Sequence, residues 1–287
     1  MYFGSIFYRK KHIRNDNYKW LTKINLSLIN DKEGKIKIGD LQFIIPINHY
    51  NTIPLHQRYL YAALISVYDI PKHFLLFWDA LIVFNEIFLQ DVYNKQFEIK
   101  EGDIIIDVGA SIGGYTCKVS KKVGDKGKII AIEPNPVNYQ YLLKNIELNR
   151  LNNIIPLNLG VFSIKKELSL ICKGYGSSVK STKDIKFGSN AIKIDVDTLD
   201  NLLSGLKLEK INLIKMDIEG SEIEAIKGAK NIIKDHKTLK LVIAAYHKNK
   251  NGIESYRILI PYLEKKNFKI YKEYLPYLFA SKIIEIN

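Results

Sequence analysis

The chain has 287 residues and is 47% hydrophobic, enough to bury the core of one large domain or of a domain with an appendage. Its net charge of +13 comes from 43 lysines and arginines, of which only five are arginines. Phosphate and base recognition favour the forked arginine side chain, so the charge is weak support for nucleic-acid binding. Nucleic acid is therefore a disfavoured partner, kept open as an alternative.

Features of the sequence also bear on location. The N-terminal residues lack the continuous apolar stretch of a signal peptide. The longest apolar stretch, residues 74–89, is too short to cross a membrane and is expected to form a half-buried helix. Cys117 and Cys172 form no C-x-x-C pair, which is typical of a reducing compartment. We therefore expect a cytoplasmic protein without a membrane span.

Residues 1–100 show mixed patterns without recognisable chemistry. Short apolar alternations predict strands at 34–39 and 41–47, and helical periodicity appears at 54–68 and in the 74–89 segment. We interpret this part as an N-terminal α/β extension that acts as a lid or recognises the substrate.

Residues 101–287 alternate regularly between apolar strand patterns and helix patterns, which predicts βαβ units and a mostly parallel sheet. Asn135 and Pro136 are start signals for one of these helices. The segments at 165–171 and 190–196 resemble a hairpin. The last two strands are joined by a turn around Pro276 that is too short for a parallel crossover, so the last strand should run antiparallel. We predict seven strands in the sheet, at residues 103–108, 128–133, 153–159, 211–217, 239–245, 268–274 and 277–286.

The segment "DVGASIGGYT" joins the first of these strands to a helix and resembles a nucleotide-binding turn. A dinucleotide motif needs a glycine at its middle position, where any side chain blocks the pyrophosphate, and this chain has Ser111 there. Asp107, at the end of the strand, would repel a phosphate. The turn therefore favours a cationic ligand without phosphates, and S-adenosylmethionine is such a ligand.

The next strand ends in an acidic residue, Glu133, placed to accept hydrogen bonds from both ribose hydroxyls. Asn158 ends the third strand, where it meets the adenine side of the pocket or satisfies a turn. The predicted cofactor-binding residues are Asp107, Gly109, Ala110, Ser111, Gly113, Glu133, Asn158 and Asp217.

The segment "INLIKMDIEGSEIEAIKGA", residues 211–229, resembles the signature of the FkbM-type methyltransferases, a K-x-D-x-E-G-x-E pattern. The pattern falls here on Lys215, Asp217, Glu219, Gly220 and Glu222. The pieces "DVGASIGGYT", "IEPNP", "VDTLDNLL" and "YHK" resemble the same family. The resemblance implies a class I methyltransferase fold, Rossmann-like, over residues 101–287. It also implies methyl transfer from S-adenosylmethionine, usually to a hydroxyl oxygen, with a small molecule or glycan as the acceptor.

Two residues are candidates for catalysis. Asp217 ends its strand at the ligand-binding edge, where it accepts from the methionine ammonium group or faces the acceptor. His247 follows the fifth strand at the same edge and is a candidate base; a histidine that only caps the strand is weighed equally.

The other acidic and polar residues of this part are weaker candidates. Glu219 and Glu222 are expected to share a helix face and to complement the helix dipole. No metal is expected, because no second donor segment is in view beside these carboxylates. Ser177 and Ser178 border the acceptor or belong to an ordinary loop.

Three alternatives stay open at this point. The first is a methyltransferase that acts on RNA or another nucleic acid, and the second is a non-catalytic binding module that retains the fold. A nicotinamide-dependent oxidoreductase is the third and weakest, because of Ser111 and Asp107.

Overall fold

A computed structural model describes residues 24–30, 32–46, 80, 83–173, 176–180, 191–206, 208–249 and 251–283. Contacts between Cα atoms divide the chain into two compact units, Met1–Trp78 and Asp79–Asn287. The second unit begins before residue 101, where we expected the methyltransferase domain to begin. The helical pattern at 54–68 lies outside the described residues.

The described part of the first unit is a three-stranded antiparallel sheet, β1 (Ile24–Leu28), β2 (Glu33–Ile38) and β3 (Leu41–Pro46). Strands β2 and β3 confirm the two strands predicted here, and β1 was not predicted. Ile36, Phe43 and Ile45 are fully buried, while lysines at alternate positions of β2 point to the other face.

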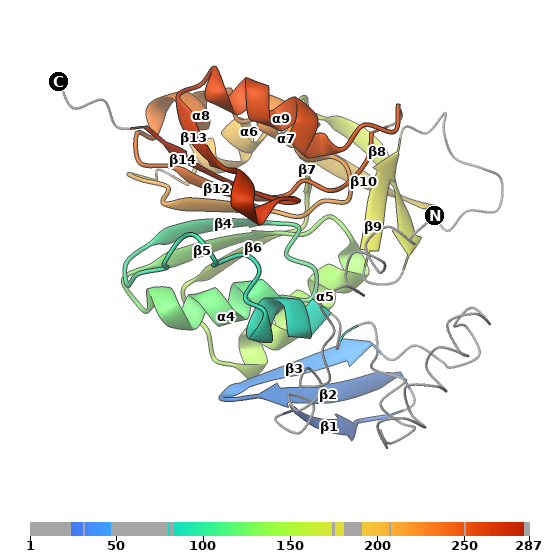
Figure 1. Ribbon diagram of the computed structural model, residues 1–287. Helices are drawn as coiled ribbons and strands as arrows, with labels where there is room; N and C mark the ends of the chain where they lie inside the picture. Colours follow the sequence, from blue (N-terminus) through green and yellow to red (C-terminus); the bar gives the residue numbers. More distant parts are fainter. Residues whose placement is uncertain are drawn as a thin grey trace. The chain divides into compact units, whose positions relative to one another are not determined.

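The second unit contains a seven-stranded sheet in the order β13-β14-β12-β11-β4-β5-β6 (Figure 1). Neighbouring strands from β12 to β6 run parallel, and β14 runs antiparallel to both β12 and β13. A dinucleotide-binding sheet is parallel throughout. The inserted antiparallel strand confirms the class I methyltransferase fold. The bounds are β4 (Ile104–Val108), β5 (Lys128–Ile132), β6 (Ile154–Leu157), β11 (Leu213–Met216), β12 (Lys240–Ala244), β13 (Phe268–Tyr271) and β14 (Tyr277–Lys282).

Helices cover both faces of this sheet, because successive residues of each strand point to opposite sides. Ile105 packs in a cluster with α4, whereas Ile106 packs in a cluster with α6, α7, α8 and α9. Helix α5 packs on the α4 side, where Leu142 contacts Ala131. The helix bounds are α4 (Gly114–Val123), α5 (Pro136–Leu148), α6 (Leu199–Ser204), α7 (Glu222–Lys227), α8 (Lys230–Asp235), α9 (Ser255–Glu264) and a 3-10 turn (Lys272–Tyr274).

The predicted helix at 74–89 is helical in its described part, which ends in a π-helical turn at Asn85–Leu89. Phe84 and Ile87 are buried and Leu89 is exposed, as a half-buried helix requires. Among the residues that the structure describes, no helix has the length and apolar character needed to cross a membrane.

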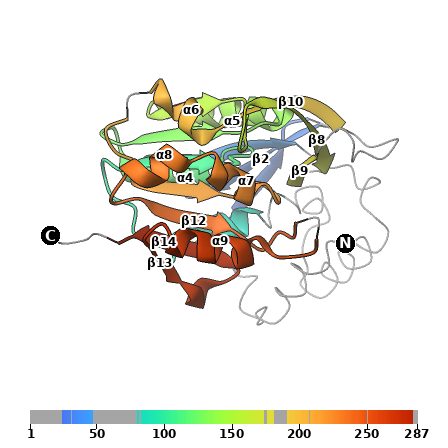
Figure 2. The same cartoon turned by 90° about the horizontal axis from the view of Figure 1, so that it is seen from above.

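A second, four-stranded sheet lies at one end of the seven-stranded sheet in both views (Figure 2). Strands β8 (Lys166–Lys173) and β10 (Ala191–Asp197) pair antiparallel, as the hairpin-like pattern predicted. Two further strands, β7 (Gly160–Val161) and β9 (Gly176–Lys180), complete this sheet and were not predicted separately.

Candidate active site

The parallel strands bring the predicted site residues to one edge of the sheet. Lys215 pairs in register with Asp107 of β4 and with Val242 of β12. Asp217, which follows β11, and His247, which follows β12, therefore lie near the turn that follows β4. The carboxyl edge of an open α/β sheet is where such folds bind their ligands.

The turn after β4 is held close to the neighbouring strands. The N–H groups of Gly109 and Ala110 both donate to the carbonyl of Ile132, at 2.9 and 3.0 Å. Gly109 has φ of +80°, and a Cβ at this position would lie 2.0 Å from the carbonyl oxygen of Asp217. Gly113, with φ of +91°, precedes the first residue of α4. Glycine is therefore required at residue 109 both for the backbone conformation and for the close approach of β11.

Asp107 lies beneath this turn and is completely buried. Its Oδ1 is 2.9 Å from Lys215 Nζ, and its Oδ2 accepts a hydrogen bond of 2.6 Å from Thr116. Lys215 also donates to the carbonyl of Gly109 at 2.9 Å. Asp107 therefore shapes the turn through Lys215 and Thr116.

Glu133 closes the turn from the end of β5. Its Oε2 accepts from the N–H of Ser111 at 2.8 Å, and its Oε1 accepts from the N–H of Asn135 at 2.9 Å. Burial raises the pKa of this carboxyl to about 7, against the lowering effect of both backbone hydrogen bonds. The Asn138 side chain also hydrogen-bonds Glu133, so about one of the carboxylate's roughly four acceptor sites is left for a ribose hydroxyl.

Asn158 is exposed and holds the corner next to Glu133. Its side-chain amide donates to the carbonyls of Glu133 at 2.8 Å and Pro134 at 3.3 Å. Two roles were expected for Asn158, and these hydrogen bonds match the role of stabilising the turn.

A second group of side chains gathers around His247. Its Nδ1 lies 2.7 Å from Glu222 Oε1, and its Nε2 lies 3.3 Å from Glu219 Oε2. Asp217 accepts a hydrogen bond of 2.6 Å from the hydroxyl of Tyr93. Three carboxylates, an imidazole and a phenol thus meet at the edge of the sheet.

The two glutamates set the charge of His247. Burial lowers its pKa, but the neighbouring carboxylates of Glu219 and Glu222 outweigh burial and raise the pKa to about 11. An imidazolium has no lone pair with which to accept a proton. In this arrangement His247 does not fit the predicted role of general base.

Glu219 and Glu222 do not share a helix face, and that expectation was wrong. Helix α7 begins at Glu222, whereas Glu219 precedes the helix with φ of +52°. Glu222 is completely buried and also accepts from the N–H of Gly220 at 3.0 Å and from the Ser255 hydroxyl at 3.3 Å. The side chains of Ser177 and Ser178 lie outside the described part of the chain.

Sequence reasoning missed Tyr93 and the contacts of Lys215. Tyr93 lies in the segment that we assigned to the extension, and no motif marks it. Lys215 belongs to the signature segment, and its position two residues before Asp217 puts both side chains on one face of the strand. From that spacing, the position of Lys215 close to the turn could have been predicted.

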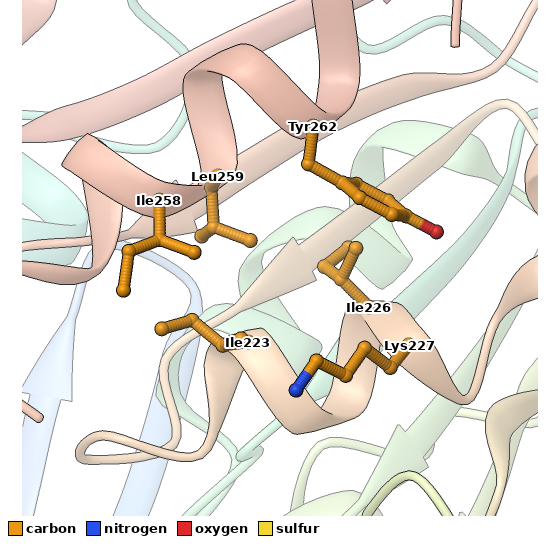
Figure 3. Close-up of a pocket in the computed structure, with 6 residues that line it drawn as sticks. All are labelled: Ile223, Ile226, Lys227, Ile258, Leu259 and Tyr262. Atoms are coloured by element: carbon orange, nitrogen blue, oxygen red, sulfur yellow. The ribbon is translucent and has the colours of Figure 1, made fainter. Parts of the chain in front are cut away.

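A small apolar pocket lies between α7 and α9, and its lining includes none of the candidate site residues (Figure 3). Its volume is about 50 Å³, and its lining includes Ile223, Leu259 and Tyr262. One water occupies about 30 Å³ in the liquid, so the pocket is too small for a nucleoside. It is not the cofactor site.

Comparison with known proteins agrees with this geometry. The Methyltransferase FkbM domain matches residues 107–270. Methyltransferase sdnD of Sordaria araneosa is 31% identical over 182 residues, which cover 52% of this chain and 69% of that protein. The hexuronic acid methyltransferase AglP of Haloferax volcanii is 31% identical over 153 residues, which cover 52% of this chain and 58% of that protein.

Solved structures give a looser match. A SAM-dependent methyltransferase from Aquifex aeolicus aligns with 76% of this chain and 95% of its own, at 18% identity and a TM-score of 0.40. Fibrillarin from Aeropyrum pernix aligns with 90% of this chain and 97% of its own, at 14% identity and a TM-score of 0.40.

Proposed function

The chain belongs to the FkbM family of S-adenosylmethionine-dependent methyltransferases, and we propose that it methylates a hydroxyl oxygen of a small molecule or glycan. The observation that carries the cofactor site is the corner in which Glu133 accepts from the N–H of Ser111. A carboxylate at this corner suits the ribose hydroxyls of the cofactor, and Ser111 crowds a pyrophosphate. Of the residues predicted from the sequence, Gly109, Ala110, Ser111, Gly113 and Glu133 are the proposed cofactor contacts. Asp107 and Asn158 act through the turn and the corner that they hold, and Asp217 is placed against the acceptor.

The acceptor class follows from chemistry and from one relative. AglP is named as a hexuronic acid methyltransferase, and hexuronic acids are sugars rich in hydroxyl groups. The proposal also places the enzyme in the cytoplasm, a location consistent with the free, buried thiol of Cys117.

The reaction is an in-line displacement at carbon. The acceptor oxygen attacks the methyl carbon of the sulfonium, a C–O bond forms as the C–S bond breaks, and the bonding electrons return to sulfur. The products are the methyl ether and the neutral thioether S-adenosylhomocysteine. The hydroxyl proton leaves to a nearby acceptor or to water. The main task of the protein is to align the two reactants, which supplies much of the rate enhancement.

Asp217 is the side chain that we place against the acceptor. One of its oxygens is held by Tyr93, while Oδ1 is buried without a hydrogen-bond partner in the described part of the chain. His247 lies beside it, paired with the two glutamates. Asp217 and His247 therefore both remain in the proposed catalytic region, but His247 is not proposed to act as the general base.

Thermal unfolding with S-adenosylmethionine, S-adenosylhomocysteine, NAD or no ligand tests the cofactor. A ligand at a hundred times its dissociation constant adds about 2.7 kcal/mol of apparent stability. We expect a shift with both adenosyl ligands and none with NAD. Glu133→Gln should weaken the shift, whereas Glu147→Gln, the same change at an exposed site of α5, should not. A shift with NAD alone would overturn the cofactor assignment.

Radiolabelled methyl transfer then tests the acceptor. The purified enzyme is incubated with labelled S-adenosylmethionine and one of three acceptor pools: hexuronic acid glycans, small polyols or total RNA. Label in a base-stable ether of a glycan or polyol supports the proposal. Label in RNA alone would indicate the nucleic-acid alternative, and cofactor binding without transfer to any pool would indicate a binding module.

A further inference from the structure

Three side chains from two segments converge beside the proposed acceptor position. Asp217 and Glu219 follow β11, and His247 follows β12. One ligand atom from each lies within 4.8 Å of the others. We propose that Asp217, Glu219 and His247 bind a divalent metal ion of the first transition row. In the sequence, no second segment with a metal-binding side chain was evident near these carboxylates. In the structure, His247 provides that side chain from the end of a different strand.

The orientation of His247 is that of a metal ligand. A histidine that binds a metal through one ring nitrogen commonly donates its other N–H to a carboxylate, which fixes the ring and raises its basicity. Here Nδ1 lies 2.7 Å from Glu222 and Nε2 lies 3.3 Å from Glu219, in a cluster that also includes Asp217. Glu222 is itself fixed by the N–H of Gly220 and the hydroxyl of Ser255. The ring is thus held with Nε2 directed at the proposed ion.

The cluster also contains polar atoms without hydrogen bonds. Among the described residues, Asp217 Oδ1 and His247 Nε2 are buried and have no hydrogen-bond partner. Nε2 is 3.3 Å from Glu219 Oε2 but lacks hydrogen-bond geometry with it. Buried polar groups are nearly always satisfied, so two such atoms within one cluster of possible metal ligands require an explanation. A cation bound by both atoms provides one, and the His247 Nε2 proton is released when the cation binds.

Asp217 and Glu219 are each arranged for ligation. The Tyr93 hydroxyl occupies one oxygen of Asp217 at 2.6 Å, which leaves the other oxygen for an ion. Ligating carboxylates are commonly hydrogen-bonded in this way. Glu219 has φ of +52°, a backbone conformation that costs a non-glycine residue energy and that clusters at functional sites. Glu219 Oε2 lies 3.3 Å from His247 Nε2.

The donor set indicates which kind of ion fits. Two carboxylates with one imidazole suit Mn²⁺ or a similar first-row ion better than Mg²⁺, which prefers oxygen ligands and retains its waters. Two ligands bound to one ion at about 2.1 Å lie at most about 4.2 Å apart, so a separation of up to 4.8 Å closes with a small side-chain rotation. Three protein ligands leave positions for water or for oxygens of the acceptor.

The chemical role of the ion rests on the proposed function. An acceptor hydroxyl bound to a divalent cation is more acidic than a free one, so it loses its proton to water more readily before it attacks the methyl carbon. The ion would thereby promote loss of the acceptor proton, a role for which His247 is unsuited because it is paired with two glutamates.

Mn²⁺ binding to the full-length protein tests the inference directly. The protein is stripped with a chelator and titrated with Mn²⁺ alone, and the electron paramagnetic resonance signal of free Mn²⁺ is followed. We expect one ion per chain, with nitrogen coupling from a histidine. Glu219→Gln and His247→Gln should each lower the affinity by more than about tenfold. Glu224→Gln, the same change on α7 at a residue bound to Lys227 and Ser163, should bind as the unaltered chain does.

The outcomes separate the metal site from the proposed function. Absence of stoichiometric Mn²⁺ binding, or equal binding by all three variants, overturns the metal site. Thermal unfolding shows whether each variant is folded, and loss of nitrogen coupling in a folded His247→Gln supports the site independently of affinity. S-adenosylhomocysteine binding is measured on the protein after the chelator has removed its metal. This measurement tests the proposed function separately, because it does not require the metal ion.

Discussion

Glu133 is a proposed contact of the cofactor, and it is almost completely buried. Its carboxyl is 5% exposed, and burial raises its pKa from 4.5 to about 7. The ionised form accepts hydrogen bonds from ribose hydroxyls, whereas the protonated form has one acceptor fewer. Cofactor affinity should therefore depend on pH near neutrality, in a range where ordinary glutamates do not titrate.

We predict that affinity for S-adenosylhomocysteine falls as the pH is lowered through about 7, by about tenfold for each further unit. The ligand-free protein should show the opposite trend in stability. A group whose pKa is raised on folding stabilises fully below its unfolded value of 4.5, and this contribution is lost as the pH rises through about 7. Calorimetric titration and urea unfolding at pH 5 to 8 measure both. Glu133→Gln should flatten both profiles, and unchanged profiles in that variant would refute the assignment.

Asp107 is a poorer target for mutation than the sequence indicates. From the motif alone we would expect Asp107→Ala to abolish cofactor binding in a folded protein. The structure pairs Asp107 with Lys215, which is 4% exposed. Removing one partner of a buried ion pair costs about 3–5 kcal/mol, because the other charge stays buried. Loss of binding in such a variant would therefore report instability as much as lost contact.

At the scale of elements, the turn between β4 and α4 depends on its contact with β11. We predict that Gly109→Ala lowers the thermal midpoint and abolishes binding of S-adenosylhomocysteine. Its Cβ would lie 2.0 Å from a backbone oxygen, and φ of +80° alone costs about 1–3 kcal/mol for a residue with a side chain. The control is Gly205→Ala, at φ of −74° with no atom within 4 Å of the new Cβ. That variant should be as stable as the unaltered chain or slightly more so, and equal behaviour of the two would contradict the proposed role of the turn.

The regular elements were predictable because their patterns are local. The periodicity of the strands and helices, the start signals at Asn135 and Pro136, and the short connection at Pro276 together predicted the mostly parallel sheet with its antiparallel last strand. Strand β1 was missed although "INLSL" alternates apolar and polar residues, because it is short and contains asparagine, which is depleted in strands. Strand β9 pairs with the neighbouring β8, and it was missed because its glycine and serines are typical of loops. The pairing of β7 with β10 joins segments more than 30 residues apart, which no local pattern encodes.

The candidate site also has a part that was predictable from the sequence and a part that was not. The turn residues and Glu133 were predictable because their roles follow from position at strand ends. The partners of His247 were not, because its contacts with Glu219 and Glu222 depend on a left-handed residue and on the angle between two connections. Tyr93 reaches Asp217 across 124 positions of sequence, a contact that only the fold reveals.

At the scale of the whole molecule, the residues just before 101 belong to the catalytic unit. Val92, Tyr93 and Phe97 are at most 5% exposed and pack against α4 and the sheet. Burying each such side chain contributes about 1.5–3 kcal/mol. The chain therefore needs this segment to complete the α4 face, although it carries no motif of the family.

Two truncations test this boundary. We predict that residues 79–287 fold and bind S-adenosylhomocysteine with the affinity of the full chain, because the described site residues and their partners all lie within this unit. Residues 101–287 should unfold at a markedly lower temperature and lose binding, because they lack the apolar side chains before residue 101 and the hydroxyl of Tyr93. Circular dichroism melts and calorimetry compare the two fragments.

Acceptor turnover by the longer fragment then tests the role of the first unit. If residues 1–78 recognise the acceptor or close over it, the 79–287 fragment should bind the cofactor normally but methylate the acceptor slowly, with a raised KM for the acceptor. Full activity in this fragment would show that acceptor recognition lies within the unit that carries Asp217 and His247. Equal stability of the two fragments would instead place the boundary at residue 101, as the sequence motifs alone indicate.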